Sequence, residues 1–224
     1  MWGKENKTKT NGEKMNASIY ETLKANCENH GATFALWNPE DHTDTSFFDD
    51  PNIYQKMTDK FVICSLCPAC SIEQLDHTPH AMFHHGGGGS NSGPRLQSAI
   101  VGTPMEGSYI THLFKPSLLG STPLNEVLGG DDGDEKMKKL DVWMRLPAND
   151  GYLKANLAYF KSECDSIGNP NLVVLALGKK TYDFLNESHF PYRVIKLPSH
   201  CDTIAYKDGT YRNQVASAII EGLY

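Results

Sequence analysis

The chain has no long apolar segment. Its longest uninterrupted apolar run covers residues 172–177, far short of the roughly 20 residues that a membrane-spanning helix needs. Residues 1–7 carry lysines with no apolar stretch behind them, so the pattern of a secretory signal is also absent. We therefore expect a cytoplasmic protein with no membrane contact.

An excess of positive charge is missing as well. The chain has 21 Lys and Arg against 27 Asp and Glu, a formal charge of -6, which excludes a protein whose whole surface attracts nucleic acid. Any basic patch must be local. Six cysteines in 224 residues, without an export signal, favour reduced thiols over a disulfide framework.

The length favours one domain, since domains average roughly 150 residues. Residues 1–15 contain four lysines and two glutamates and almost nothing to bury, which predicts a flexible tail. Residues 16–224 then form a single domain. We expect a monomer that needs no obligate protein partner.

Apolar runs rich in β-branched and aromatic residues predict the strands of this domain. The four runs lie at residues 61–66, 108–114, 172–177 and 192–197. Their nearly continuous apolar character is typical of parallel strands covered on both faces. Residues 32–37 form a further short strand candidate.

Helix-like segments separate these strands. The first is capped by Asn16, carries apolar residues at helical spacing and ends at Gly31. The others cover residues 49–59, 94–101, 151–167, 179–186 and 209–224, and residues 129–134 read as an acidic, Gly-rich linker or surface loop. The order predicts an α/β fold: a three-layer α/β/α sandwich with a central parallel sheet of about four strands.

In such sheets, ligands bind at the carboxyl ends of the strands. Residues 67–70, Cys-Pro-Ala-Cys, follow the first strand, and residues 198–201, Pro-Ser-His-Cys, follow the last. Residues 83–95 begin with Phe-His-His, continue with the four glycines 86–89 and lead into a helix. Together these segments predict one cleft lined by His, Cys, Ser and Gly.

The order of these segments resembles the uracil-DNA glycosylase superfamily, especially its small bacterial α/β/α members. The resemblance is carried by residues 34–37, 61–69, 83–84, 107–115, 176–182 and 197–200. It covers most of residues 17–224 and rests on order and spacing, because no single motif is highly specific. It implies an enzyme that flips a base out of the DNA stack and hydrolyses its N-glycosidic bond.

The resemblance also implies roles for particular turns. The first turn of the family positions the attacking water with a carboxylate or amide, and here Cys67 stands at that place. The end of the second strand reads the base edge, and His112 replaces the family's Asn or Asp. In the last turn Leu197 replaces the family's His, unless a shifted register brings Ser199 or His200 there.

The roles implied by this resemblance and by loop position are as follows. Catalysis is assigned to Asp76 or Glu73 for the water and to Ser199 and His200 for the leaving group or a phosphate; the base pocket to Cys67, Pro68, Ala69, Cys70, Phe83, His84 and His112; and DNA contacts to Lys115, Lys179, Ser199 and Ile204.

Several of these features have a simpler alternative. The glycines 86–89 either border a pocket for a bulkier base, such as a modified cytosine of phage DNA, or form a surface loop. Phe83 either stacks on a base or packs in the core. The substitution at Cys67 leaves open a non-catalytic reader of modified DNA or nucleotides, and the setting is open between repair and antiviral defence.

We expect no cofactor, although two metal sites deserve comparison. Cys64, Cys67 and Cys70 have a spacing found in iron–sulfur proteins, but Cys64 lies within a predicted strand and no fourth cysteine follows at a suitable distance. Cys67 and Cys70 could bind zinc together with His77 and His80, but the middle spacing is short for known zinc sites. Reduced thiols and loop histidines are the preferred interpretation.

Overall fold

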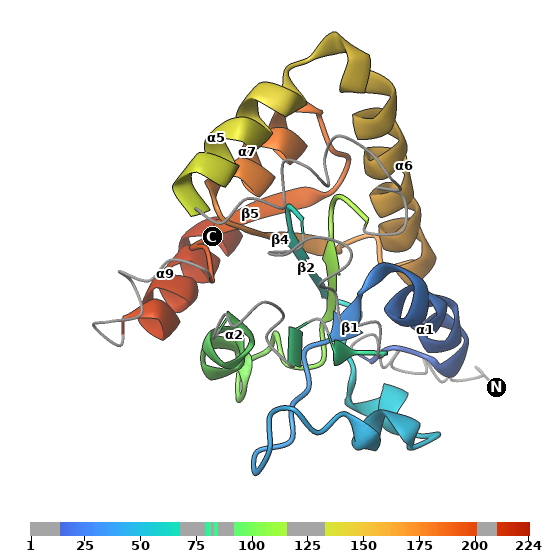
Figure 1. Cartoon of the computed structure of the whole chain (residues 1–224). Coiled ribbons are helices and arrows are strands. Elements are labelled where there is room, and N and C mark those ends of the chain that lie inside the picture. Colours follow the sequence, from blue (N-terminus) through green and yellow to red (C-terminus); the bar gives the residue numbers. More distant parts are fainter. Residues whose placement is uncertain (1–13, 68–78, 82, 85–91, 116–132, 201–209) are drawn as a thin grey trace, which may run out of the picture.

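The computed structural model describes residues 14–67, 79–81, 83–84, 92–115, 133–200 and 210–224. These residues form an α/β fold in which helices cover both faces of a central, mostly parallel sheet (Figure 1). The α/β class predicted from the sequence is confirmed. No helix within the described ranges has the length and apolar character needed to cross a membrane.

The sheet has five strands in the order β1-β3-β2-β4-β5. Their bounds are Thr33–Phe34 (β1), Phe61–Ser65 (β2), Tyr109–His112 (β3), Val173–Leu177 (β4) and Arg193–Leu197 (β5). Strands β3, β2, β4 and β5 are parallel, as their apolar runs predicted, and β1 adds an antiparallel edge strand. All residues of β2, β3 and β4 are buried, which explains their nearly continuous apolar character.

The helices of the described chain largely follow the sequence pattern. They are α1 (Ala17–His30), α2 (Ser92–Ile100), α5 (Gly133–Met144), α6 (Asp150–Ile167), α7 (Lys179–Glu187) and α9 (Tyr211–Leu223), with a 3-10 turn, η6, at Pro147–Asn149. Asn16 caps α1 by accepting a hydrogen bond from the Ile19 backbone N–H at 2.9 Å. Gly31 ends it with a left-handed φ of 64°.

Three sequence-based expectations need correction. Met15 belongs to the core and not to a tail, being 2% exposed. The brief helix expected at residues 49–59 is two 3-10 turns, η1 (Ser46–Asp49) and η2 (Ile53–Lys56), because Asp50 precedes a proline and takes an extended conformation. Helix α5 begins inside the expected loop 129–134, and residues 129–132 lie outside the described chain.

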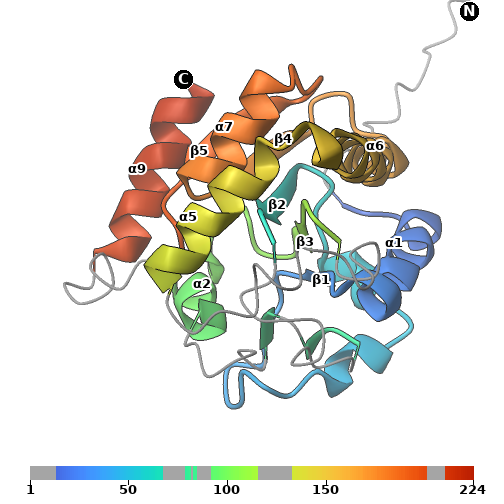
Figure 2. The same cartoon turned by 45° about the horizontal axis from the view of Figure 1, so that its top comes forward.

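Strand alternation divides the core between two faces of the sheet. Along β3, Tyr109 packs with α1 and α6 on one face, whereas Ile110 packs with α2 and α9 on the other. The same alternation holds for β2 and β4. Helices α5 and α7 lie side by side (Figure 2) and join the α1/α6 side of the core. An ion pair between Asp141 and Lys180 links them. The fold is therefore layered as helices, sheet and helices.

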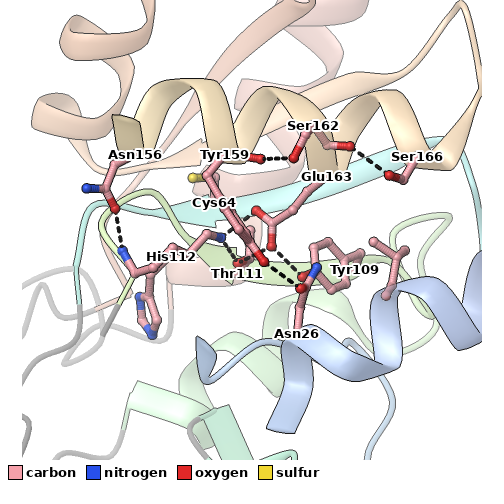
Figure 3. Close-up of polar contacts among 12 residues, drawn as sticks. Asn26, Cys64, Tyr109, Thr111, His112, Asn156, Tyr159, Ser162, Glu163 and Ser166 are labelled. Atoms are coloured by element: carbon pink, nitrogen blue, oxygen red, sulfur yellow. Dashed lines mark hydrogen bonds and ion pairs between the residues drawn. The ribbon is translucent and has the colours of Figure 1, made fainter. Parts of the chain in front are cut away.

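A buried ion pair joins the end of β3 to α6 (Figure 3). Lys115 is 0% and Glu163 2% exposed, and the Lys115 ammonium contacts the Glu163 carboxylate. The ammonium also donates to Thr111 Oγ1 at 2.5 Å, and the Tyr109 hydroxyl donates to Glu163 Oε1 at 2.7 Å. The Lys115 backbone N–H donates to Asn156 Oδ1 on α6 at 2.8 Å. Both charges are thus compensated within the interior.

Replacing Glu163 by glutamine should destabilise the fold strongly. The Lys115 ammonium would stay buried without its counter-charge, a change that typically costs about 3–5 kcal/mol in the free energy of unfolding. Urea unfolding followed by circular dichroism measures this loss.

The control is Lys161→Ala, which removes an exposed ion pair with Asp165 on the same helix and should cost less than about 1 kcal/mol. Equal small losses for both variants would show that the buried pair contributes little.

Candidate functional site

Several polar side chains lie at the carboxyl ends of the strands. Strand β2 lies between β3 and β4, and the chain turns from one side of it to the other after β3. This reversal places a topological switch point at the ends of β2 and β4, where open α/β sheets bind ligands. Ser65 ends β2, His112 ends β3, and Ser199 and His200 follow β5.

Three of the predicted site residues lie together at this edge. The Phe83 and His112 rings stack with centroids 4.8 Å apart and an interplanar angle of 21°. The Phe83 and His200 rings are 6.4 Å apart and tilted by 41°. We call Ser65, Phe83, Arg95, His112 and His200 the Phe83–His112 cluster. Segments distant in sequence therefore meet where the sequence pattern predicted a cleft.

Phe83 is held in place by the start of α2. A side chain at Gly93 would put its Cβ 2.3 Å from the Phe83 carbonyl oxygen, so only glycine permits this approach. Phe83 itself is 4% exposed and packs with the α2/α9 core. One face of its ring is covered by His112. Its packing role is thus shown, while base stacking stays a prediction.

His112 is buried in the cluster and is 4% exposed. Its Nδ1 lies 2.5 Å from Ser65 Oγ, and its Nε2 is buried without a hydrogen-bond partner among the described residues. Burial lowers the pKa of His112 well below its ordinary value, and the positive charge of Lys115 and the nearby His200 add to this effect. The imidazole is therefore neutral at physiological pH.

His200 lies beside a cation. The Arg95 guanidinium, from the first turn of α2, donates to the His200 carbonyl oxygen at 3.5 Å. Burial, with a smaller contribution from Arg95, lowers the pKa of His200 to about 4. At neutral pH Arg95 consequently carries the positive charge of the Phe83–His112 cluster.

Ser199 packs against the turn that opens α7. Gly178 has a φ of 84°, and a Cβ at this position would lie 3.5 Å from the Ser199 Cβ. The Gly178 N–H donates to the Leu197 carbonyl oxygen at 2.9 Å, which ties the two turns together. Next to them, Lys179 is exposed and pairs with Asp183 on the same helix. Ser199 and Lys179 thus share the edge where a DNA phosphate was predicted.

Two predicted site residues serve the interior instead. Lys115 is fully buried in the pair with Glu163, so it cannot reach a DNA phosphate. His84 was predicted to line the base pocket, but it is fully buried, and its Nδ1 and Nε2 lie 2.7 Å from the carbonyl oxygens of His80 and Leu36. Both predictions are wrong because these side chains face neighbouring elements of the core.

Other predictions concern residues outside the described chain. These are Pro68, Ala69, Cys70, Glu73, Asp76, the glycines 86–89 and Ile204. They include Asp76 and Glu73, one of which was predicted to position the water. Cys67 is described, and its side chain is partly exposed beside the α1/α6 core.

The described thiols and histidines do not gather into a metal site. Among the described residues, no group of three or more His, Cys, Asp or Glu could hold a metal ion. Cys64 faces the interior, where burial raises the pKa of its thiol. His80 accepts or donates a hydrogen bond with Thr33 at 3.1 Å and stacks on Phe48 at 3.8 Å. Cys70 and His77, the remaining predicted ligands, lie outside the described ranges.

Ser65 and Arg95 are site residues that sequence reasoning missed. Ser65 ends an apolar strand and carries no motif of its own. It becomes significant only through the register that sets it opposite His112. Arg95 follows the proline at the start of α2, and a positive side chain in the first turn of a helix bordering a predicted loop was the available signal.

No family model, curated protein or solved structure matches this chain. The geometry described above is therefore the basis for any functional conclusion.

Acidification should destabilise the fold through its buried histidines. The pKa values of His80, about 3, and His200, about 4, lie below the unfolded value near 6.5. Between the folded and unfolded pKa values the unfolded chain binds more protons than the folded chain. The contribution of these two histidines to the free energy of unfolding is therefore fully present above about pH 6.5 and is lost as the pH falls towards about 4. Urea midpoints measured across this range test the effect.

A His200→Gln variant should lose stability less steeply with falling pH, because the glutamine cannot be protonated. The matched control is His42→Gln, since His42 is exposed. Identical pH profiles for wild type and His200→Gln would contradict this account.

Proposed function

We propose that this protein is a DNA glycosylase of the uracil-DNA glycosylase type. It hydrolyses the N-glycosidic bond of a flipped-out uracil or a bulkier modified pyrimidine and leaves an abasic site. The observation that carries the proposal is the Phe83–His112 cluster at the carboxyl ends of β2 and β3, where a buried imidazole nitrogen has no partner among the described residues. An unsatisfied buried polar atom of this kind is uncommon in proteins and favours a ligand that completes it.

The chemistry of base removal fits groups that donate hydrogen bonds without adding charge. The bond breaks towards an oxocarbenium-like sugar, and the departing base accumulates negative charge that donors stabilise. The depressed pKa values keep His112 and His200 neutral at physiological pH. Neutral imidazoles can donate hydrogen bonds to the base, and they add no positive charge that would repel the oxocarbenium-like sugar.

The contact with DNA has to be local, because the chain carries a net charge of -6. Lys179 is exposed at the turn after β4, and Ser199 packs against the same turn. Arg95 lies beside His200. These groups are suited to the phosphates that flank a flipped nucleotide. In this proposal Ser199 and His200 hold a phosphate or the leaving base, and Asp76 or Glu73 positions the water.

A second candidate is a reader of modified DNA or nucleotides on the same fold. One observation favours it. Cys67 stands where the resembling family has an Asp or Asn, and a thiol orients water poorly. Abasic-site formation distinguishes an enzyme from a reader.

The decisive assay uses oligonucleotides that carry uracil, hypoxanthine, hydroxymethylcytosine or glucosylated hydroxymethylcytosine, treated with alkali after incubation. We expect strand breaks with one class of base. His200→Ala should lower the rate by about 100-fold, since removing one donor to a developing charge has an effect of that size. His189→Ala, at an exposed position, is the control that should retain activity.

If the protein cleaves none of the substrates but binds one of the modified duplexes, the result would reject the glycosylase and favour the reader. Cleavage that is unaffected by His200→Ala would place the reaction elsewhere in the chain.

A further inference from the structure

The His84 imidazole lies between two backbone carbonyl oxygens. Its Nδ1 is 2.7 Å from the carbonyl oxygen of His80, and its Nε2 is 2.7 Å from the carbonyl oxygen of Leu36. The His84 side chain is fully buried. A carbonyl oxygen has no proton to give and can only accept a hydrogen bond. Both ring nitrogens must therefore donate.

The two distances also fix the orientation of the ring. Turning the imidazole by half a turn about its Cβ–Cγ bond would place carbon atoms opposite the two oxygens. A C–H group meets a carbonyl oxygen at about 3.3–3.6 Å, whereas the observed 2.7 Å is typical of a hydrogen bond from a charged nitrogen. The nitrogens are therefore the atoms that face the oxygens.

Only the doubly protonated ring satisfies both contacts. A neutral imidazole has one N–H donor and one nitrogen that accepts. In the neutral form, one nitrogen lone pair would point at a carbonyl oxygen inside the protein, where an unsatisfied polar group is costly. The geometry thus requires an imidazolium at His84, with one proton on each nitrogen.

Two aromatic rings accommodate this charge. The centroid of the His84 ring is 5.4 Å from that of Trp37 and 5.6 Å from that of Phe48, which it meets edge to face. A cation within about 6 Å of an aromatic centroid is attracted by the ring, and more strongly when it is away from water. Trp37 and Phe48 are themselves buried. The cation is thus held by two charge-assisted hydrogen bonds and by its aromatic neighbours.

The neighbouring histidine does not share this charge. Burial lowers the pKa of His80 to about 3, and His84 and Lys24 of α1 add smaller effects in the same direction. His80 is therefore neutral at physiological pH. On η1, which contributes Phe48, the Asp49 side chain is exposed. Of the two histidines, His84 is the one that carries the positive charge.

The two hydrogen bonds of His84 fasten the chain next to Phe83 to the edge of the sheet. Leu36 follows β1, and its N–H donates to the Phe34 carbonyl oxygen at 2.8 Å. Phe83 directly precedes His84, and its own carbonyl oxygen lies against Gly93 at the start of α2. The position of Phe83 is thus set by His84 on one side and by α2 on the other.

We infer that His84 is a positioning residue that acts as a buried imidazolium, and that its two N–H groups hold Phe83 in the Phe83–His112 cluster while both protons are bound. Loss of either proton sets a nitrogen lone pair against a carbonyl oxygen and favours release of this part of the chain. The use of Phe83 by a substrate rests on the proposed function, whereas the charge of His84 does not.

The sign of the pH dependence is opposite to that of His80 and His200. A histidine in the unfolded chain has a pKa of about 6.5, and the folded chain retains the second proton of His84 beyond that pH. The contribution of His84 to the free energy of unfolding is therefore fully present below about pH 6.5. It is lost as the pH rises past the point at which the folded ring gives up a proton.

The charge of His84 can be observed directly by nuclear magnetic resonance. Long-range proton–nitrogen correlation spectra of the full chain at neutral pH should show both His84 nitrogens protonated and one proton on the His80 ring. His84→Gln identifies the His84 signals by their disappearance. A singly protonated His84 in the wild type at neutral pH would overturn the inference.

A pH series on the same protein tests the effect on Phe83. Nuclear Overhauser contacts between the Phe83 and His112 rings, whose centroids are 4.8 Å apart, should weaken as His84 loses a proton above neutral pH. In His84→Gln these contacts should not change with pH, because the amide does not titrate. His189→Gln, at an exposed position, is the matched control and should keep the wild-type profile.

Contacts that persist unchanged after His84 has lost a proton would reject the positioning role. The wild-type series decides this point even if His84→Gln fails to fold.

The same dependence should appear in the reaction. Above the titration of His84, the wild-type rate of abasic-site formation should fall about tenfold per pH unit, because the doubly protonated fraction falls by that factor. The rate of His84→Gln should be low and independent of pH in this range. A wild-type rate that stays constant through the titration of His84 would also reject the positioning role.

The two proposals fail in different ways. A doubly protonated His84 whose titration releases Phe83, with no abasic sites in any oligonucleotide, would reject the glycosylase and keep the imidazolium. Abasic sites formed by a protein whose His84 is neutral would keep the glycosylase and reject the present inference.

Discussion

The buried ion pair between Lys115 and Glu163 is the constraint on which the arrangement of the site depends. It joins the chain immediately after β3 to the middle of α6, in the interior where both charges have left water. Such a pair is tolerated only with good geometry and further hydrogen bonds, which Thr111 and Tyr109 supply. The path of the chain beyond His112 is thereby fixed.

The strand that carries this pair serves two purposes through simple alternation. Tyr109 and Thr111 face the ion pair, while Ile110 and His112 face the opposite helices. One side of β3 therefore holds the fold together, and its other side ends in the Phe83–His112 cluster. His112 is held by a strand and not by a loop, and a strand fixes the position of a side chain more accurately.

Much of this architecture was accessible from sequence, because continuous apolar runs identify parallel strands and their carboxyl ends must meet at one edge. The family resemblance and the positions of the loops singled out His112, His200 and Phe83, whose rings the structure brings together. Lys115 was misassigned because a lysine after a strand is usually solvated, and its partner lies 48 residues further along the chain. Ser65 was missed because its meaning depends on the register between β2 and β3, which composition does not reveal. Helix α5 was hidden by the acidic, Gly-rich residues at its start.

The two edges of the sheet affect how copies of this chain meet. Strand β1 pairs with β3 over only two residues, and β5, at the other edge, exposes Arg193 and Lys196. Short edges and edge charges discourage a strand from a second molecule from adding to a sheet. The assembled sheet therefore offers poor templates for edge-to-edge aggregation.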